Sequence, residues 1–367
     1  MADNYFRGGE RRAFELGNRG PIEFGADGGL RDGILDAYWR TGFYVFEGVV
    51  RGAELEDLVA DFERILDRAP SGSSSTMDAK GRPAIGPEYE RPSFRFARPL
   101  SDPHGGTAIT GGRYPAKMSE PEPPEGAPEE VLFQISGILQ LMDSGLRLYG
   151  HPQLLSVAEQ INGADFTPFT DTIWVKPAGL GASVAWHQDG TTLWSSPGCD
   201  EGTHGFNFMM QLYGSNAANA LWVVPGTHKN GKIDIKARLE ANAGSDRLPD
   251  AVPMLCRPGD VAICNRQVLH GSFANTSPAA RATFVFGFHR RASVLEAQGW
   301  AKQPYDEARI HERSRLIALA IDARQQRYPD EPRYHYQPLA GELEDNRFND
   351  ATRERILKNY NLNDLGL

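Results

Sequence analysis

The sequence predicts a mainly β protein with flanking helices, in which short strands form a barrel or a double-sheet roll. Short runs rich in β-branched and aromatic residues alternate with turn residues between residues 163 and 290. On both sides of this region, apolar residues recur at the spacing of amphipathic helices. The predicted strands are residues 170–176, 183–187, 206–213, 220–224, 251–255, 261–265 and 283–289.

Helices are predicted before and after these strands. Residues 30–38 form an amphipathic helix that ends at a Thr-Gly pair, and a strand follows through Phe43, Val45 and Val49. The other predicted helices are residues 52–69, 131–150, 151–163 and 313–328.

The bulk properties are those of an ordinary globular protein. A chain of 367 residues, 40% hydrophobic and 24% charged, can hold one large β-rich domain or two average domains. The formal net charge of −9 argues against a nucleic-acid partner or an anionic membrane, which need a basic surface. We expect a Gly-rich, charged N-terminal arm at 1–28, the β domain at 29–300, and a C-terminal helical extension at 301–367 packed on the same domain.

The cysteines suit a reducing compartment. Cys199, Cys256 and Cys264 are odd in number and have no C-x-x-C spacing, so they predict neither a disulfide framework nor a cysteine-rich zinc site. The N-terminus carries charge where a signal peptide needs an apolar core, and no apolar run approaches the ~20 residues of a membrane span. We expect a cytoplasmic protein.

Residues 70–129 predict a long loop inside the domain, rich in Pro, Gly and Ser. Between Gly72 and Met118 this segment holds seven Lys or Arg against four Asp or Glu, although the whole protein is acidic. One interpretation is a solvated insertion. The other is a lid whose cations meet an anionic substrate, and its candidate residues are Arg95, Arg98, Arg113 and Lys117.

The stretch "VAWHQDGTTLW", residues 184–194, contains a candidate metal site. His187 and Asp189 point to the same face if the strand continues to Asp189, and otherwise they are an ordinary strand end entering a polar turn. His270, which ends an apolar run 81 residues after Asp189, is the best third ligand. Two imidazoles and one carboxylate form the facial triad of non-haem Fe(II) oxygenases, whereas structural zinc sites usually have four Cys or His ligands.

Arg281 adds a candidate cosubstrate anchor. It follows His270 by 11 residues and begins the strand "RATFVFGFH". A lone arginine at a strand start is more often a surface ion pair, but a fixed guanidinium can also bind a carboxylate through two hydrogen bonds. Beside a facial triad, its natural partner is the distal carboxylate of 2-oxoglutarate, whose keto-acid end chelates iron.

Four segments resemble the phytanoyl-CoA dioxygenase family of Fe(II)/2-oxoglutarate-dependent oxygenases. They are "ILDAYWRTGFYVFEGVVRGAELEDLVADFERIL", "VKPAGLGASVAWHQD", "NALWVVPGTHKNG" and "LHGSFANTSPAAR", and they occur in the family's order between Gly29 and Arg291. The resemblance implies a double-stranded β-helix (a cupin-like jelly roll) that uses Fe(II), 2-oxoglutarate and O₂. It also implies that His187, Asp189 and His270 bind the iron and that Arg281 holds 2-oxoglutarate.

Further site residues follow from the resemblance. Ser272 matches a position that often helps to bind the cosubstrate carboxylate, although a local turn hydroxyl is an equal alternative. Thr172 and Lys176 share a strand face with Trp174, where the family often places cosubstrate or substrate contacts. A solvated strand-end cation is the alternative for Lys176.

Other side chains compete for places in the site. His204 is the most plausible decoy ligand, whereas His228 is expected to be structural and Gln188 to point away from the iron. Trp186 and Trp194 are either core residues or an aromatic wall. The remaining histidines are interpreted as surface or satisfied core residues: His104, His151, His289, His311 and His335.

The resemblance implies hydroxylation of an aliphatic C–H of a small-molecule metabolite, with succinate and CO₂ as co-products. Desaturation or cyclisation by the same iron chemistry is the alternative, as is a non-catalytic or redox-neutral cupin-type metal-binding protein. Asp189 argues against halogenation, because halogenating relatives have a small residue at this position. The substrate, which the 70–129 cations suggest is anionic, and the oligomeric state are not readable from the sequence.

Overall fold

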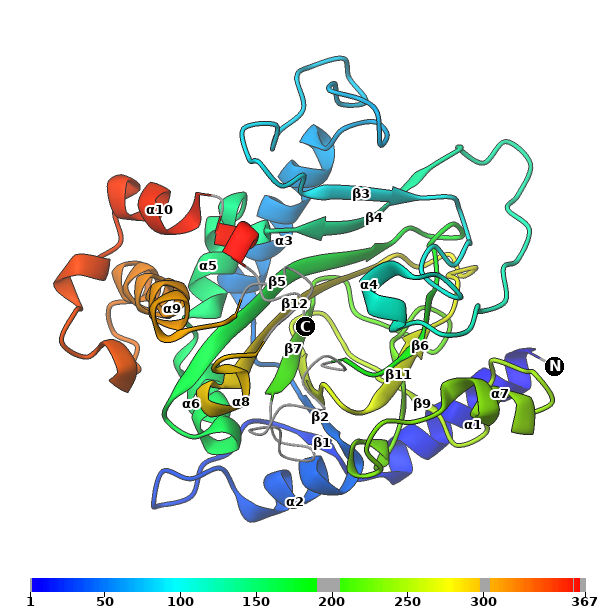
Figure 1. The fold of residues 1–367 in the computed structure, drawn as a ribbon, viewed down its shortest axis with the longest axis horizontal. Helices are drawn as coiled ribbons and strands as arrows, with labels where there is room; N and C mark the ends of the chain where they lie inside the picture. Colours follow the sequence, from blue (N-terminus) through cyan, green and yellow to red (C-terminus); the bar gives the residue numbers. More distant parts are fainter. Residues whose placement is uncertain (1, 190–204, 298–303, 359, 364–367) are drawn as a thin grey trace.

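Two facing β-sheets form the centre of the computed structural model, which describes residues 2–189, 205–297, 304–358 and 360–363 (Figure 1). The larger sheet has the strand order β1 (Arg19–Gly20), β2 (Phe43–Phe46), β10 (Val261–Asn265), β7 (Gly205–Gln211), β12 (Arg281–Arg290), β5 (Phe166–Lys176), β4 (Val131–Ser136), β3 (Phe94–Ala97). The smaller sheet has the order β6 (Val184–His187), β11 (Leu269–Ser272), β8 (Trp222–Val224), β9 (Val252–Pro253). All pairings are antiparallel except that of β1 with β2. The predicted jelly roll with flanking helices is confirmed.

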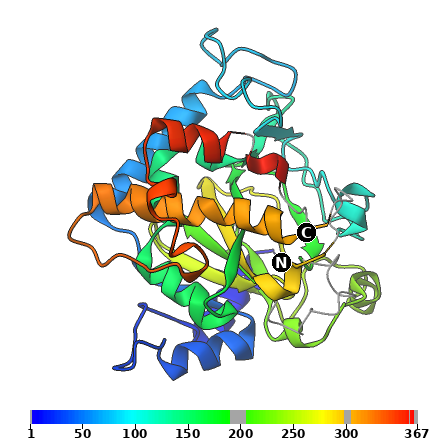
Figure 2. The ribbon, with the colours of Figure 1, turned by 60° about the vertical axis from the view of Figure 1, so that its left-hand side comes forward.

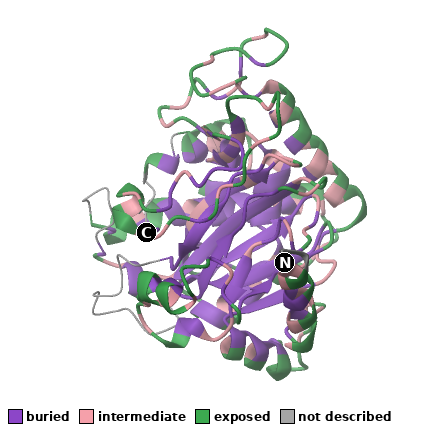
Figure 3. Ribbon diagram, turned by 90° about the vertical axis from the view of Figure 1, so that its right-hand side faces the viewer, coloured by how far each residue is buried: buried purple, intermediate pink, exposed green. Residues whose placement is uncertain are grey.

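Helices cover the outer face of the larger sheet. The helices of eight or more residues are α1 (Ala2–Glu15), α2 (Asp32–Thr41), α3 (Gly52–Arg68), α6 (Pro152–Asn162), α9 (Glu307–Arg327) and α10 (Asp350–Leu357). The shorter ones are α4 (Ile109–Gly112), α5 (Asp143–Tyr149), α7 (Ile235–Ala241) and α8 (Arg291–Val294). Figure 2 shows α6 and α9 in front of the larger sheet. Figure 3 shows that the central strands are almost wholly buried. Among the described helices, none is long and apolar enough to cross a membrane.

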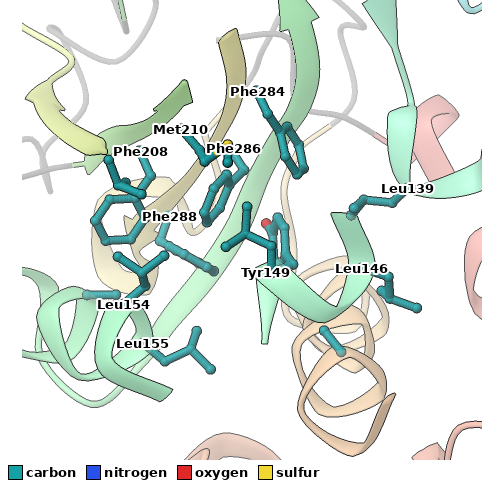
Figure 4. Close-up of a cluster of buried hydrophobic side chains, with 14 of the residues drawn as sticks. Leu139, Leu146, Tyr149, Leu154, Leu155, Phe208, Met210, Phe284, Phe286 and Phe288 are labelled. Carbon is teal, nitrogen blue, oxygen red and sulfur yellow. The ribbon is translucent and has the colours of Figure 1, made fainter. Parts of the chain in front are cut away.

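Side chains along β12 point alternately into the hydrophobic core under the helices and to the inner face of the larger sheet. Phe284, Phe286 and Phe288 point to the helices, where Tyr149 of α5 lies 5.3 Å from the Phe286 ring and 5.1 Å from the Phe288 ring (Figure 4). Thr283 and Val285, on either side of Phe284, point the other way, toward the smaller sheet. The helices therefore fix the position of a strand whose opposite face is free to carry polar groups.

The predicted helix over residues 131–150 is wrong in its first part. Residues 131–136 form β4, which pairs with both β3 and β5; a short 3-10 helix follows at Ile138–Gln140, and an α-helix begins only at Asp143. Val131, Phe133 and Ile135 are buried while their neighbours are not, which is the alternation of a half-buried strand. Because β4 pairs with a strand on each side, residues 131–136 adopt the extended conformation although the apolar residues after them have helical spacing.

The N-terminal and C-terminal segments both pack on the jelly roll. Residues 2–15, expected to be part of an arm, form α1, whose Tyr5 stacks on Trp222 of β8 at 4.8 Å and donates a hydrogen bond to the Leu248 carbonyl (2.9 Å). Helix α9 packs on α5 and β5, where Arg313 donates to the Phe169 carbonyl (2.8 Å). The domain boundaries themselves stay a prediction.

The long segment at 70–129 has two parts. Its first part is tied by ion pairs, such as that of Arg82 Nε with Asp78 Oδ2 at 2.7 Å. Its second part forms β3 and α4 and contributes side chains to the central cavity. The predicted loop is therefore partly a strand of the larger sheet.

His151 predicts a pH dependence of stability. It is buried at the start of α6, and burial, followed by repulsion from Arg324, lowers its pKa to about 3. In the unfolded chain the His151 imidazole is protonated near pH 6.5, whereas in the folded protein it stays neutral down to about pH 3. The free energy of unfolding is therefore unaffected above pH 6.5 and falls by about 1.4 kcal/mol per pH unit as the pH drops toward 3. We expect His151→Gln to reduce the loss of unfolding free energy between pH 6.5 and 4.5 by roughly 2.5 kcal/mol in urea titrations. The exposed His335 provides the control substitution, and an unchanged loss in His151→Gln contradicts the prediction.

Candidate active site

A cavity of about 500 Å³ lies between the two sheets. Its floor is built by rows of residues that pair across neighbouring strands of the larger sheet and therefore point to one face. One row is Arg95, Gln134, Trp174, Thr283 and Gln211, and the next is Ser136, Thr172, Val285 and Met209. The opposite wall comes from β6 and β11. The floor of the cavity is therefore the inner face of the larger sheet, to which Thr283 and Val285 of β12 point.

Strand pairing brings the three candidate metal ligands together. His270 of β11 pairs directly with His187 of β6, and their ring centroids lie 4.0 Å apart. Asp189 follows just after the end of β6, and its backbone N–H donates to the Arg266 carbonyl (2.7 Å). The ligand atoms of the three residues lie within 4.8 Å of one another. The strand does not need to continue to Asp189, because this hydrogen bond holds the turn in place.

Both imidazoles are oriented for metal binding. The Nδ1 atom of His187 lies 2.8 Å from the Ala185 carbonyl, and that of His270 lies 2.9 Å from the Val268 carbonyl. Each Nδ1 therefore carries the proton, and each Nε2 faces Asp189, at 3.6 Å from Oδ1 for His187 and 3.8 Å from Oδ2 for His270. Burial lowers the pKa of both histidines, which favours the neutral form that binds a metal.

The Asp189 carboxylate is held ionised by its neighbours. Burial opposes ionisation, but Arg113 and then Arg266 outweigh it and hold the pKa of Asp189 well below its usual range. Arg113 Nη1 donates to Oδ1 at 2.9 Å, and Asn207 Nδ2 donates to Oδ2 at 3.2 Å. Two neutral imidazoles and one carboxylate are a donor set that fits Fe(II).

Arg281 and Ser272 lie in the same cavity with unused hydrogen-bonding capacity. Arg281 Nη1 donates to the Asn219 carbonyl (2.8 Å), and among the described residues no carboxylate forms an ion pair with it. Its Nε and the Ser272 Oγ are buried without a hydrogen-bond partner in that part of the chain. Burial lowers the pKa of Arg281 to about 10, so the side chain stays a cation. A buried cation and an unsatisfied hydroxyl in one cavity fit a bound carboxylate.

Thr172 lines the cavity as expected, but Lys176 does not. Lys176 is 2% exposed, and its Nζ donates to the carbonyls of Ala182 (2.5 Å) and Phe273 (2.6 Å). The solvated alternative is therefore wrong, because the loop that directly follows β5 and the loop that follows β11 both cover the end of the strand. The side chain ties these loops to the sheet, and its pKa is lowered by burial.

The other side chains considered for the site lie away from the cavity wherever the structure describes them. Trp186 is buried in the core, where its Nε1 donates to the Asp246 carbonyl (2.7 Å), and His228 lies 3.1 Å from the Trp39 carbonyl away from the cavity. Gln188 bonds to backbone groups away from the site, as predicted. His204 and Trp194 lie outside the described residues.

His104 is the histidine whose place the sequence did not indicate. It was grouped with surface and core histidines, yet it lines the cavity beside Tyr114, with their ring centroids 5.0 Å apart. Burial, followed by repulsion from Arg95 and Arg113, lowers its pKa to about 4. His104 is thus a neutral ring in the cavity wall at neutral pH.

Of the four predicted lid cations, two reach the cavity. Arg95 and Arg113 line it, whereas Arg98 and Lys117 pair with Glu120 at the surface (2.8 and 3.1 Å). Sequence reasoning missed Arg91, Arg266 and Asn207, which also line the cavity. The sequence indicates Arg266 only weakly as a site residue, through its position four residues before His270. In the structure Arg266 lies in the turn between β10 and β11.

A jelly roll with two imidazoles and a carboxylate at one centre defines the class of mononuclear facial-triad proteins. Residues 136–283 match the sequence model of the family described as Phytanoyl-CoA dioxygenase (PhyH). This match to the family's sequence model confirms the resemblance stated from the sequence.

Two plant proteins are also similar to this chain in sequence. Phytanoyl-CoA dioxygenase 1 of Oryza sativa subsp. japonica is 28% identical over 144 residues, which cover 37% of this chain and 47% of the rice protein. The match therefore spans about half of that relative. Phytanoyl-CoA dioxygenase of Arabidopsis thaliana is 22% identical over 293 residues, covering 76% of this chain and 94% of the Arabidopsis protein.

A solved structure shares the fold. EctD from S. alaskensis, crystallised with 2-oxoglutarate and 5-hydroxyectoine, aligns with a TM-score of 0.51 at 19% identity. The alignment covers 77% of this chain and 85% of EctD. At this identity the likeness supports the jelly-roll architecture and leaves the substrate open.

Proposed function

We propose that the chain is a non-haem Fe(II)/2-oxoglutarate-dependent dioxygenase that hydroxylates an aliphatic C–H of a small-molecule metabolite in the cytoplasm. One observation carries the proposal: a neutral two-histidine, one-aspartate centre opens into the same cavity as the buried Arg281 cation. The family of residues 136–283 supports the same chemistry. In this proposal one molecule each of 2-oxoglutarate, O₂ and substrate gives succinate, CO₂ and the hydroxylated product.

The side chains have separate roles in this reaction. His187, Asp189 and His270 would hold Fe(II), which supplies the activation of O₂ when bound. Arg281 would bind the distal carboxylate of 2-oxoglutarate and orient its keto-acid end toward the triad, with Ser272 and Thr172 as further polar groups of the same cavity. Arg113 and Asn207 keep the Asp189 carboxylate in place through their hydrogen bonds. The walls of the cavity limit the access of water to the reacting groups.

The direct test is turnover of 2-oxoglutarate. Protein reconstituted anaerobically with Fe(II) is mixed with O₂ and 2-oxoglutarate, and succinate is measured by mass spectrometry over a panel of candidate metabolites. We expect Fe(II)-dependent and O₂-dependent succinate, with no succinate when Zn(II) replaces Fe(II). Absence of succinate with every panel member, together with no binding of 2-oxoglutarate to the metal-loaded protein, contradicts the proposal.

Desaturation or cyclisation remains the second outcome of the same chemistry, because the triad does not distinguish it from hydroxylation. The product mass decides between them: hydroxylation adds one oxygen atom, whereas desaturation removes two hydrogens.

A further inference from the structure

The candidate metal centre and the cosubstrate anchor lie at different levels of the larger sheet. Arg281 begins β12, and Gly287 lies ~20 Å further along the same strand at the usual rise per residue. Gly287 pairs with Asn207 of β7, whose side chain donates to the carboxylate of Asp189 (3.2 Å). The proposed function places 2-oxoglutarate at the Arg281 end of the cavity. The residues beside Gly287 therefore belong to the part of the cavity that is left for a substrate.

Strand β5 has a bulge at the level of Gly287. Its pairing with β12 shifts register there, so that two residues of β5, Phe169 and Thr170, lie opposite this one glycine. Both residues line the cavity, as does the next one, Asp171. The Arg266 guanidinium lies 3.8 Å from the centroid of the Phe169 ring, and the Arg266 carbonyl holds the turn of the metal centre. The bulge therefore brings an aromatic side chain close to the candidate metal site.

A C-terminal 3-10 helix, η5 (Tyr360–Asn363), packs on this part of β5. The Tyr360 hydroxyl donates to Asp171 Oδ1 (2.7 Å). The guanidinium of Arg313 bridges the two segments, because Nη1 donates to the Tyr360 carbonyl (3.0 Å) and Nη2 donates to the Phe169 carbonyl (2.8 Å). Figure 2 shows the C-terminal helices, in red, next to α9, which carries Arg313. The start of η5 is therefore tied to both the bulge and a core helix.

A glycine lets η5 approach the end of β4. Gly137, which follows β4 and lines the cavity, has a φ of +67°. A Cβ atom at this position would lie 2.8 Å from Nδ2 of Asn361, the second residue of η5. Asn361 is buried, and its carbonyl accepts a hydrogen bond from Arg91 Nη1 (2.8 Å). The contacts of Tyr360 and Asn361 together fix the position of the residue that follows them.

That residue, Leu362, adds an apolar side chain to the cavity wall. It lines the cavity and is 41% exposed, whereas the two residues before it are buried. Small-molecule sites are lined mainly by apolar side chains, with a few fixed polar groups among them. An apolar group of a ligand that covers Leu362 removes its exposed surface from water, which favours binding.

We propose that η5 forms a wall of the substrate site and that Leu362 determines specificity, by packing on an apolar group of the substrate. The bulge residue Phe169 would contact the same ligand from β5. The inference rests on the proposed function, because the metal ligands set where the reacting C–H must lie. The C-terminal extension then has a role in choosing the substrate, in addition to its packing on the jelly roll.

The test measures binding of 1-hexanol, a neutral molecule with an apolar chain, by calorimetry. The protein is loaded anaerobically with Zn(II) and saturating 2-oxoglutarate, so that the Arg281 end is occupied and no turnover occurs. We expect Leu362→Ala to weaken 1-hexanol binding about fivefold, because it removes an apolar contact, and to leave 2-oxoglutarate affinity unchanged. Leu362→Met, which keeps an apolar side chain of similar volume, should retain the wild-type affinity for 1-hexanol. Leu343→Ala removes a leucine that is 38% exposed and outside the cavity lining, and it should have no effect.

Repeating the titrations without metal or 2-oxoglutarate separates this inference from the proposed function. A loss of 1-hexanol affinity in Leu362→Ala but not in Leu343→Ala, in either arm, supports the wall even if 2-oxoglutarate is not turned over. Absence of 1-hexanol binding to the wild type, or the same affinity in wild type and Leu362→Ala in both arms, overturns the inference. Normal succinate formation would then leave the proposed function standing.

Discussion

Asp189→Ala is expected to lower succinate formation by about 1000-fold and to weaken metal binding. The substitution removes the anionic ligand and leaves two neutral imidazoles, which hold a divalent cation poorly. It also removes the carboxylate that pairs with Arg113 at 2.9 Å inside the protein. Because breaking a buried ion pair leaves a charge uncompensated, the metal-free protein should lose about 3 kcal/mol of unfolding free energy. Succinate assays, metal titration and urea unfolding measure the three effects.

Asp171→Asn is the matched control for Asp189→Ala. It changes a buried carboxylate of the same cavity that bonds to Tyr360 and Leu139 and is not one of the three candidate metal ligands. We expect its metal affinity to stay within a few fold of the wild type. Succinate formation by Asp189→Ala at the wild-type rate would show that the metal, if one is needed, is bound elsewhere.

Local sequence patterns were enough to find the candidate triad, but strand pairing explains it. The spacing of His187 and Asp189 is visible in the sequence, and His270 was identified from its position at the end of an apolar run. The sequence did not predict β11 as a strand, yet its antiparallel pairing with β6 is what places His270 opposite His187. Such a register depends on two segments about 80 residues apart, which no local periodicity encodes.

The places where prediction failed all depend on contacts that lie outside the local sequence pattern. Residues 131–136 form a strand because β3 and β5 pair on either side of them. Lys176 is buried because carbonyls from residues 182 and 273 surround its ammonium group. Arg113 reaches Asp189 from a loop with no periodicity, so the sequence indicates its charge but does not predict its partner. Tertiary contacts outweigh local preference at each of these positions.

The chemistry of the cavity accounts for the arrangement of its arginines. Arg113 and Arg266 lower the pKa of a carboxylate that must stay ionised, so they act on the metal centre. Arg281 lies at the start of β12, which β5 and β4 separate from β3, the edge strand that carries Arg95.

Arg281→Gln is expected to weaken 2-oxoglutarate binding by about 100-fold, close to 3 kcal/mol. The substitution removes the charge and the two-pronged geometry that bind a carboxylate, while Ser272 remains in place. Calorimetry on the Zn(II)-loaded protein without O₂ measures the affinity directly. Arg95→Gln is the matched control from the same cavity, and its 2-oxoglutarate affinity should stay unchanged.

Unfolding experiments on the metal-free protein distinguish binding from a structural role for Arg281. A structural arginine loses a stabilising ion pair when it is replaced, but among the described residues Arg281 has no such pair, and burial lowers its pKa to about 10. Its burial as a cation therefore opposes folding until an anion binds. We expect Arg281→Gln to unfold at the same urea concentration as the wild type or at a higher one, and 2-oxoglutarate to stabilise only the wild type. A variant that is less stable than the wild type yet keeps its 2-oxoglutarate affinity would assign Arg281 to the fold, and the cosubstrate carboxylate would then need another partner.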